Sequence, residues 1–98
     1  MHGILFEWSP AKAMANEQKH GVSFYDAMTL FGDLLSKTVA DPGHSAEEDR
    51  YVTIGRAQSQ RLLVVVHTER GERIRLISAR KATKRERQQY EAHTEETT

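Results

Sequence analysis

Residues 61–69 read RLLVVVHTE, and this stretch decides the fold. A short run of five apolar residues is typical of a strand that is buried on both faces. Arg70-Gly71 follows as a candidate two-residue turn, because Gly tolerates the positive φ that tight hairpins need. Alternating apolar and polar residues at 72–81 predict the returning strand, and the β-branched stretch 51–55 predicts a strand upstream.

A turn at Arg70-Gly71 sets the register of the hairpin. It places His67 opposite Ile74 and Arg61 opposite Arg80. One face of the hairpin then carries Leu63, Val65, His67, Ile74, Leu76, Ser78 and Arg80. The other face carries Leu62, Val64, Val66, Arg73, Arg75 and Ile77. Arg75 and Arg80 therefore share a face only if a bulge intervenes.

The segments around this hairpin predict an α+β domain. Ser9 and Ser23 are candidate N-caps of two helices, and Gly21 is a candidate left-handed terminator. Thr83 and Glu86 form a capping box, which predicts a C-terminal helix that ends near residue 93. Short strands are expected at 3–8 and 34–39, and an acidic loop at 40–49.

The expected arrangement is a mostly antiparallel, twisted sheet with two N-terminal helices on one face and a C-terminal helix. Few helices remain to cover strand 61–69 from its other side. Part of that side is therefore expected to be a groove or a partner site.

Length and composition bound the function classes. Ninety-eight residues are expected to form one domain at 1–93, followed by a polar tail at 94–98. The chain has no cysteine, which excludes disulfides and thiolate zinc sites. Its histidines show no metal-ligand spacing, so neither a metal nor a cofactor is expected. Because no signal peptide or long apolar run is present, the default expectation is a cytoplasmic protein without membrane contact.

Charge is unevenly distributed along a chain whose formal net charge is zero. Residues 1–49 hold three Lys/Arg against eight Asp/Glu, a net charge of −5. Residues 50–87 hold eleven against three, a net charge of +8, and residues 88–98 hold none against three. This asymmetry favours an anionic partner for the 50–87 segment, and the alternative is solvated charge on exposed faces.

Six stretches, taken together and in order, resemble the BrnT family of type II toxins. They are FEWSPAK at 6–12, KHGVSF at 19–24, RYVTIGR at 50–56, LVVVHTE at 63–69, RLISARKAT at 75–83 and ERQQY at 86–90. The resemblance extends over residues 4–92. Any one of these stretches alone would be a weak signal.

The resemblance implies a RelE-like fold and a metal-independent endoribonuclease activity that cleaves RNA and arrests translation. It also implies a cognate BrnA-like antitoxin that neutralises the toxin. Because the family's antitoxins dimerise through their DNA-binding part, the expected assembly is a heterotetramer of two toxins and two antitoxins. Such an assembly contacts DNA only through the antitoxin.

Arg80 is the first candidate catalytic residue, since it matches the family's Ser-x-Arg segment at the end of the last strand. A phosphate there can meet the guanidinium and the amides that open the helix at Thr83. The alternative is an ion pair with Glu86. Arg56 is the second candidate: it matches the family's Ile-Gly-Arg segment and is expected to project toward Arg80. Its alternative is a solvated arginine at a strand end.

His67 is the third candidate, as a base whose intrinsic pKa lies near neutrality. The alternative is a core histidine, because the residue lies in an apolar strand. Tyr90 is expected to pack on the sheet, with stacking on an RNA base as the alternative. Further RNA contacts are expected from the basic residues Arg50, Arg75, Lys81, Lys84 and Arg85.

A second class of function stays open. The same basic surface would suit a module that binds RNA or protein without cleaving it, because a fold does not fix a function.

Overall fold

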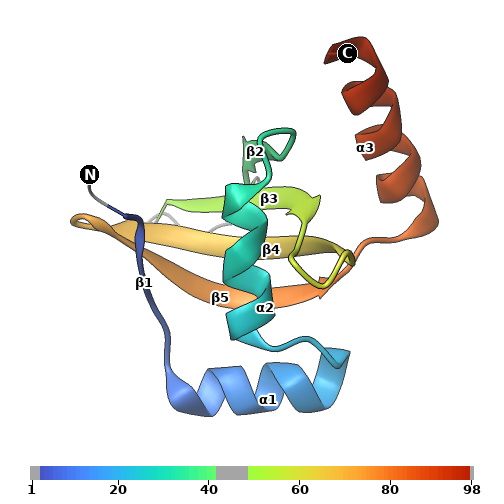
Figure 1. Ribbon diagram of the computed structural model, residues 1–98. Helices are drawn as coiled ribbons and strands as arrows, with labels where there is room; N and C mark the ends of the chain where they lie inside the picture. Colours follow the sequence, from blue (N-terminus) through green and yellow to red (C-terminus); the bar gives the residue numbers. More distant parts are fainter. Residues whose placement is uncertain (1–2, 42–48, 98) are drawn as a thin grey trace.

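The structure, a computed structural model, describes residues 3–41 and 49–97 (Figure 1). Most of the expected acidic loop at 40–49 lies outside these residues, as do His2 and His44. Five strands form one sheet within the described part, in the order β1-β5-β4-β3-β2. Their bounds are β1 (Leu5–Glu7), β2 (Lys37–Ala40), β3 (Arg50–Arg56), β4 (Leu62–Arg70) and β5 (Arg73–Lys81).

Strand β1 runs parallel to β5, and the other three neighbouring pairs are antiparallel. The helical elements are α1 (Pro10–His20), α2 (Phe24–Met28), the 3₁₀ turn η1 (Thr29–Gly32) and α3 (Lys84–Thr97). The expected α+β class is confirmed, with a mostly antiparallel sheet, two N-terminal helices and one C-terminal helix.

Local sequence signals start and end the helices. Ser9 Oγ accepts the Lys12 N–H at 3.3 Å, and Ser23 Oγ accepts the Asp26 N–H at 3.0 Å. Gly21 ends α1 in the left-handed conformation with φ 68°. The expected end of the last helix near residue 93 is wrong, because α3 continues to residue 97 through a stretch without Gly or Pro.

The N-terminal helices and η1 pack on one side of the sheet, which we call the helix face. Buried apolar side chains form its core: Val22, Phe24, Ala27, Leu30, Ala57, Leu63, Val65, Leu76 and Ala79. Figure 1 shows α1 and α2 beside the sheet, whereas α3 stands at one end of it.

Asn16 fastens α1 to the free edge of β5. Its Nδ2 donates to the Val22 and Ala79 carbonyls at 3.0 and 2.9 Å, and its Oδ1 accepts the Ala79 N–H at 3.0 Å. Because β1 pairs only with the first residues of β5, this part of the edge would otherwise lack a partner strand. The Asn16 side chain therefore satisfies backbone groups of β5 that a neighbouring strand would otherwise bond.

The β4–β5 hairpin turns one residue later than expected. Arg70 still pairs across the hairpin, so Gly71-Glu72 forms the turn. Gly71 takes φ 62° at the first central position, which suits a type II′ turn. The expected register is therefore wrong, and His67 lies opposite Leu76.

Ile77 is an extra residue in β5, where the register shifts between Val66 and His67. A bulge of this kind reverses the in–out alternation for the rest of the strand. Ala79 therefore packs in the core of the helix face, and Arg80 lies on the opposite side. The expectation that Arg80 shares a face with His67 is wrong, because simple alternation does not allow for the extra residue.

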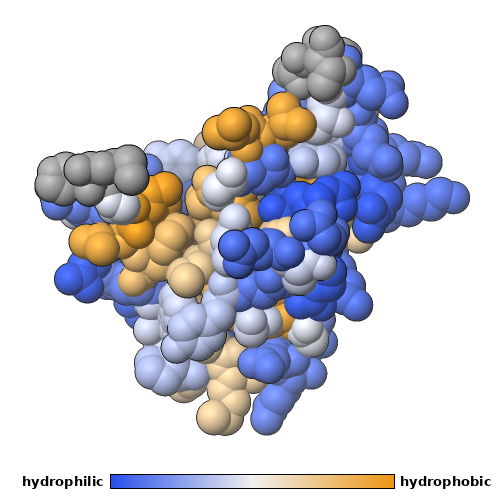
Figure 2. Space-filling view, viewed as in Figure 1, coloured by the Kyte–Doolittle hydropathy of each residue, from blue (hydrophilic) through white to orange (hydrophobic). Residues whose placement is uncertain are grey.

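We call the other side of the sheet the open face. Apolar side chains of its central strands lie there: Val52, Ile54, Val64 and Val66. Helix α3 stands over one end of this face. Tyr90 is the buried side chain of α3, and the other described side chains of this helix are exposed or half-buried. Figure 2 shows hydrophilic surface over α3 and hydrophobic surface near β1, where Ile4 and Leu5 are about half exposed. No described helix has the length and apolar character needed to cross a membrane.

Candidate active site

Four arginines that the sequence analysis named as candidates lie on the open face. The register sets Arg50 and Arg75 on either side of Thr68, and Arg80 opposite Val64. Ile54 of β3 pairs with Val64, and Arg56 lies two residues further along β3 on the same side of the sheet. The expectation that Arg75 points away from Arg80 is wrong, because the bulge at residue 77 lies between them.

The four arginines form two groups. Arg50 and Arg56 are the ends of β3, which at the usual strand rise places them about 20 Å apart. Arg75 lies near Arg50 and forms an ion pair with Glu7, with 2.8 Å between Nη1 and Oε2. The other group, Arg56 and Arg80, meets α3.

Arg80 forms a two-pronged ion pair with Glu86. Its Nη1 and Nη2 donate to the two carboxylate oxygens at 2.8 and 2.9 Å. Glu86 also closes the expected capping box: Oε1 accepts the Thr83 N–H at 2.8 Å, and Thr83 Oγ1 accepts the Glu86 N–H at 3.1 Å. The hydrogen bond from Arg80 lowers the pKa of Glu86 to about 2, and the same bond raises the pKa of Arg80. The anticipated ion pair is thus present.

Asp33, which follows η1, joins β3 to α3. Its Oδ2 accepts the Arg56 N–H at 2.8 Å and the Tyr90 O–H at 2.7 Å, and Oδ1 accepts the Leu35 N–H at 2.9 Å. Burial pushes the pKa of Asp33 upward, but these hydrogen bonds outweigh it and leave the pKa below its ordinary value. Burial, followed by the bond to Asp33, raises the pKa of Tyr90.

Helix α3 bridges the two arginines of this group. The Arg56 guanidinium lies over the Tyr90 ring, 5.7 Å from its centroid, and donates to the Gln60 carbonyl at 2.9 Å. Glu86, which holds Arg80, precedes Tyr90 by one helical turn, so both side chains project from one face of α3. We call the resulting cluster the α3 junction: Asp33, Arg56, Arg80, Glu86 and Tyr90.

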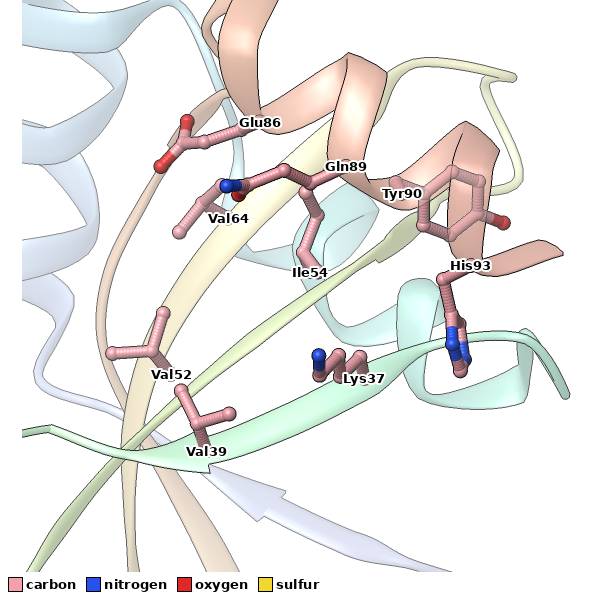
Figure 3. Close-up of a pocket in the computed structure, with 9 residues that line it drawn as sticks. All are labelled: Lys37, Val39, Val52, Ile54, Val64, Glu86, Gln89, Tyr90 and His93. Carbon is pink, nitrogen blue, oxygen red and sulfur yellow. The ribbon is translucent and has the colours of Figure 1, made fainter. Parts of the chain in front are cut away.

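A hollow of roughly 390 Å³ lies beside the α3 junction, between α3 and the open face (Figure 3). Apolar side chains from three strands line its floor: Val39, Val52, Ile54 and Val64. Polar side chains line its rim: Lys37, Glu86, Gln89, Tyr90 and His93. Strand 61–69 was expected to lack cover on one side, and the hollow lies on that side.

His67 lies on the helix face, away from the α3 junction. Its side chain is buried, and Nε2 lies 2.7 Å from Thr53 Oγ1. The ring meets Phe31 edge-on, with 5.0 Å between ring centroids. Burial lowers the pKa of His67 to about 4. The structure therefore does not bring His67 together with Arg56 and Arg80, and its catalytic role stays a prediction.

The remaining basic candidates surround the start of α3. Lys81, Lys84 and Arg85 are exposed and follow Arg80 closely in the chain. Among residues 3–41 and 49–97, no three His, Asp or Glu side chains gather where they could hold a metal ion.

Sequence reasoning missed the part played by Asp33, and for Tyr90 it considered packing on the sheet or stacking on an RNA base. These two residues are separated by 57 positions, and no local sequence pattern indicates that they are in contact. Tyr90 does pack, but through its hydroxyl and ring it also connects α3 to β3.

The arrangement can bind an anion with two fixed guanidinium groups on one face of the sheet. Arginine suits phosphate because its planar fork donates two parallel hydrogen bonds. Glu86 occupies the fork of Arg80, and a phosphate oxygen pair can replace a carboxylate there with similar geometry.

Comparisons with known proteins identify the family and the fold. The family model described as "Ribonuclease toxin, BrnT, of type II toxin-antitoxin system" matches residues 8–86. The chain is similar in fold to the 1.1 Å crystal structure of the Brucella abortus ribonuclease toxin BrnT. The TM-score is 0.61 at 22% identity, over 84% of this chain and 100% of that chain. The search among curated proteins found no match. Since the family model covers most of its length, this chain belongs to the BrnT family of ribonuclease toxins of type II toxin–antitoxin systems.

Proposed function

We propose that this chain is a toxin that cleaves RNA as a metal-independent endoribonuclease in the cytoplasm and thereby arrests translation. The α3 junction is the proposed site. One observation carries the proposal: Arg56 and Arg80 lie on the same face and meet the same helix, beside a hollow. Family membership supports the ribonuclease class.

Cleavage without a metal uses the RNA itself as nucleophile. The 2′-oxygen attacks the adjacent phosphorus, and the bond to the 5′-oxygen breaks. A base removes the 2′-hydroxyl proton, and the leaving oxygen takes up a proton. Negative charge grows on the phosphoryl oxygens during the attack, and Arg56 and Arg80 would stabilise it.

His67 does not enter this scheme as a neighbour of the two arginines, because the sheet lies between them. We therefore base the proposal on Arg56 and Arg80. The catalytic prediction for His67 can be tested in the same cleavage assay.

The RNA would extend from the α3 junction across nearby basic surface. Lys81, Lys84 and Arg85 would contact phosphates at the start of α3. Arg50 and Arg75 share the open face, about 20 Å away, and would contact phosphates several nucleotides along.

The proposed protein partner is a BrnA-like antitoxin in a heterotetramer of two toxins and two antitoxins, which contacts DNA only through the antitoxin. The hollow suits part of this partner, because its apolar floor lies among arginines. An antitoxin segment with apolar and acidic side chains would cover the floor and neutralise the α3 junction in one contact.

One observation favours a second function, a module that binds RNA or protein without cleaving it. Arg80 is already held by both oxygens of Glu86, so its role in this chain would then be structural. Arg80→Ala and Glu86→Gln both remove that ion pair. Under the second function, we expect the two variants to have equal effects on toxicity.

The cleavage assay uses purified wild-type protein and single-stranded RNA with EDTA present. We expect cleavage fragments that accumulate with time. Intact RNA after long incubation with folded protein at high concentration would favour the second function.

A further inference from the structure

Helix α3 buries little of its own surface among the described side chains. Tyr90 is its buried side chain, with 7% of its surface exposed, and the other described side chains are half-buried or exposed. A helix that is polar on all sides has no apolar stripe to fix its position. Individual polar contacts, such as those of Glu86 and Tyr90, therefore help to determine where it lies.

Two of these contacts differ in reach. The Arg80–Glu86 pair joins the first turn of α3 to the end of β5, only six positions earlier in the chain. The Tyr90–Asp33 hydrogen bond joins residues 57 positions apart and crosses from α3 to the turn after η1. Of these two contacts, the second is the one that links α3 to the segment beside β3.

Asp33 is itself firmly held. Its carboxylate accepts the backbone N–H of Arg56 and of Leu35, so its oxygens are fixed relative to both β3 and the turn. Gly55 allows this close approach: a Cβ at residue 55 would lie 3.0 Å from Ser36 Cβ and 3.4 Å from Asp33 Oδ2. The Arg56 guanidinium then lies over the ring that Asp33 positions.

We propose that Asp33 is a positioning residue that fixes α3 through the Tyr90 hydroxyl. It thereby sets the place of the Arg56 guanidinium relative to Arg80. The expected effect of Asp33 on RNA cleavage rests on the proposed function. The structural part of the proposal, the attachment of α3, stands on the hydrogen bonds of Asp33.

Tyr90→Phe is the first test, because it removes the hydroxyl and keeps the ring beneath Arg56. Asp33→Asn is the second, since an amide cannot accept all three hydrogen bonds as the carboxylate does. Asp26→Asn is the matched control: Asp26 also bonds side chains from a distant segment, Ser59 and Arg61, but lies outside the α3 junction.

The first readout is hydrogen exchange of the α3 amides, which needs no RNA. We expect exchange to be about tenfold faster or more in Tyr90→Phe and Asp33→Asn, the effect of losing one hydrogen bond to a charged group. The double variant should exchange no faster than the faster single variant, because both remove one contact. Asp26→Asn should leave exchange of α3 unchanged.

The second readout is RNA cleavage, in which we expect kcat to fall about tenfold while KM changes less than about threefold. A purely structural role would lower the thermal midpoint of unfolding without lowering kcat more than it changes KM. Unchanged α3 exchange in folded Tyr90→Phe would overturn the proposal, as would faster exchange with unchanged kcat. If the wild-type protein cleaves no RNA, the proposed function fails, and the exchange comparison alone decides whether Asp33 positions α3.

Discussion

His67 and Arg80 come from neighbouring strands, yet the sheet separates them. The His67 ring is buried beside Thr53 and Phe31, and with a pKa of about 4 it is neutral at pH 7. Arg80 keeps a partly exposed guanidinium, whose pKa is raised by the hydrogen bond to Glu86. A phosphate on the open face therefore meets fixed positive charge and does not reach the imidazole of His67.

At this scale, we predict that His67 makes the fold sensitive to mild acid. The unfolded chain binds a proton at His67 below about pH 6.5, whereas the folded chain binds it only near pH 4. The unfolded state thus holds more protons between these values, and stability falls as the pH drops. We expect the free energy of unfolding to fall by about 2 kcal/mol from pH 7 to pH 5.

Urea unfolding at both pH values measures this loss. His67→Gln keeps a polar partner for Thr53 but does not titrate, so most of the loss should vanish in that variant. An equal loss in wild type and variant would mean that another group causes it.

At the scale of elements, Asn16 joins α1 to β5. We predict that Asn16→Ala lowers the free energy of unfolding by about 2–3 kcal/mol, because it leaves buried backbone groups of Ala79 without a partner. Glu17→Ala, at an exposed neighbouring position of the same helix, should change it by less than about 0.5 kcal/mol. Chemical denaturation measures the free energy of unfolding of both variants. Similar values for Asn16→Ala and Glu17→Ala would show that Asn16 does not stabilise the attachment of α1 to β5.

Elements could be predicted where their signals are local. Ser9, Ser23 and the Thr83–Glu86 capping box bond to groups three residues away, and sequence alone identified each of them. The strands followed from their apolar runs. The bulge at Ile77 could not be predicted, because it depends on which residues the opposite strand presents.

The candidate site shows the same limit. Arg56 and Arg80 were identified from the family resemblance, but the face of Arg80 depended on the bulge. The contact between Asp33 and Tyr90 depends on the packing of the whole chain, so no local pattern indicates it.

At the scale of the whole molecule, one face of the sheet is closed and the other is partly open. Two helices and η1 fill the helix face, while α3 covers only one end of the open face. The apolar floor of the hollow and the surrounding arginines remain accessible to a partner.

We predict that the antitoxin covers this hollow. Val39 lines the hollow and is 49% exposed, so Val39→Glu should cost little stability yet weaken the complex about tenfold or more. Leu34→Glu is the matched control, because Leu34 is 98% exposed and does not line the hollow. We expect it to weaken the complex less than about threefold.

Co-expression with the neighbouring gene product, size-exclusion chromatography and thermal melting measure the complex. The wild-type toxin should co-elute with the antitoxin and melt at a higher temperature than alone, as binding to the folded state requires. A toxin that elutes alone with an unchanged melting temperature would rule out this partner. Equal weakening by both variants would place the contact elsewhere.

The central claim is that the α3 junction cleaves RNA, and the rate of cleavage by Arg80→Ala with EDTA present tests it most directly. Arg61→Ala is the control, because Arg61 also pairs with a carboxylate, Asp26, but lies outside the α3 junction. We predict that Arg80→Ala stays folded and cleaves about 100-fold more slowly or worse, while Arg61→Ala cleaves at the wild-type rate. Folded Arg80→Ala that cleaves RNA as fast as the wild type would contradict the account.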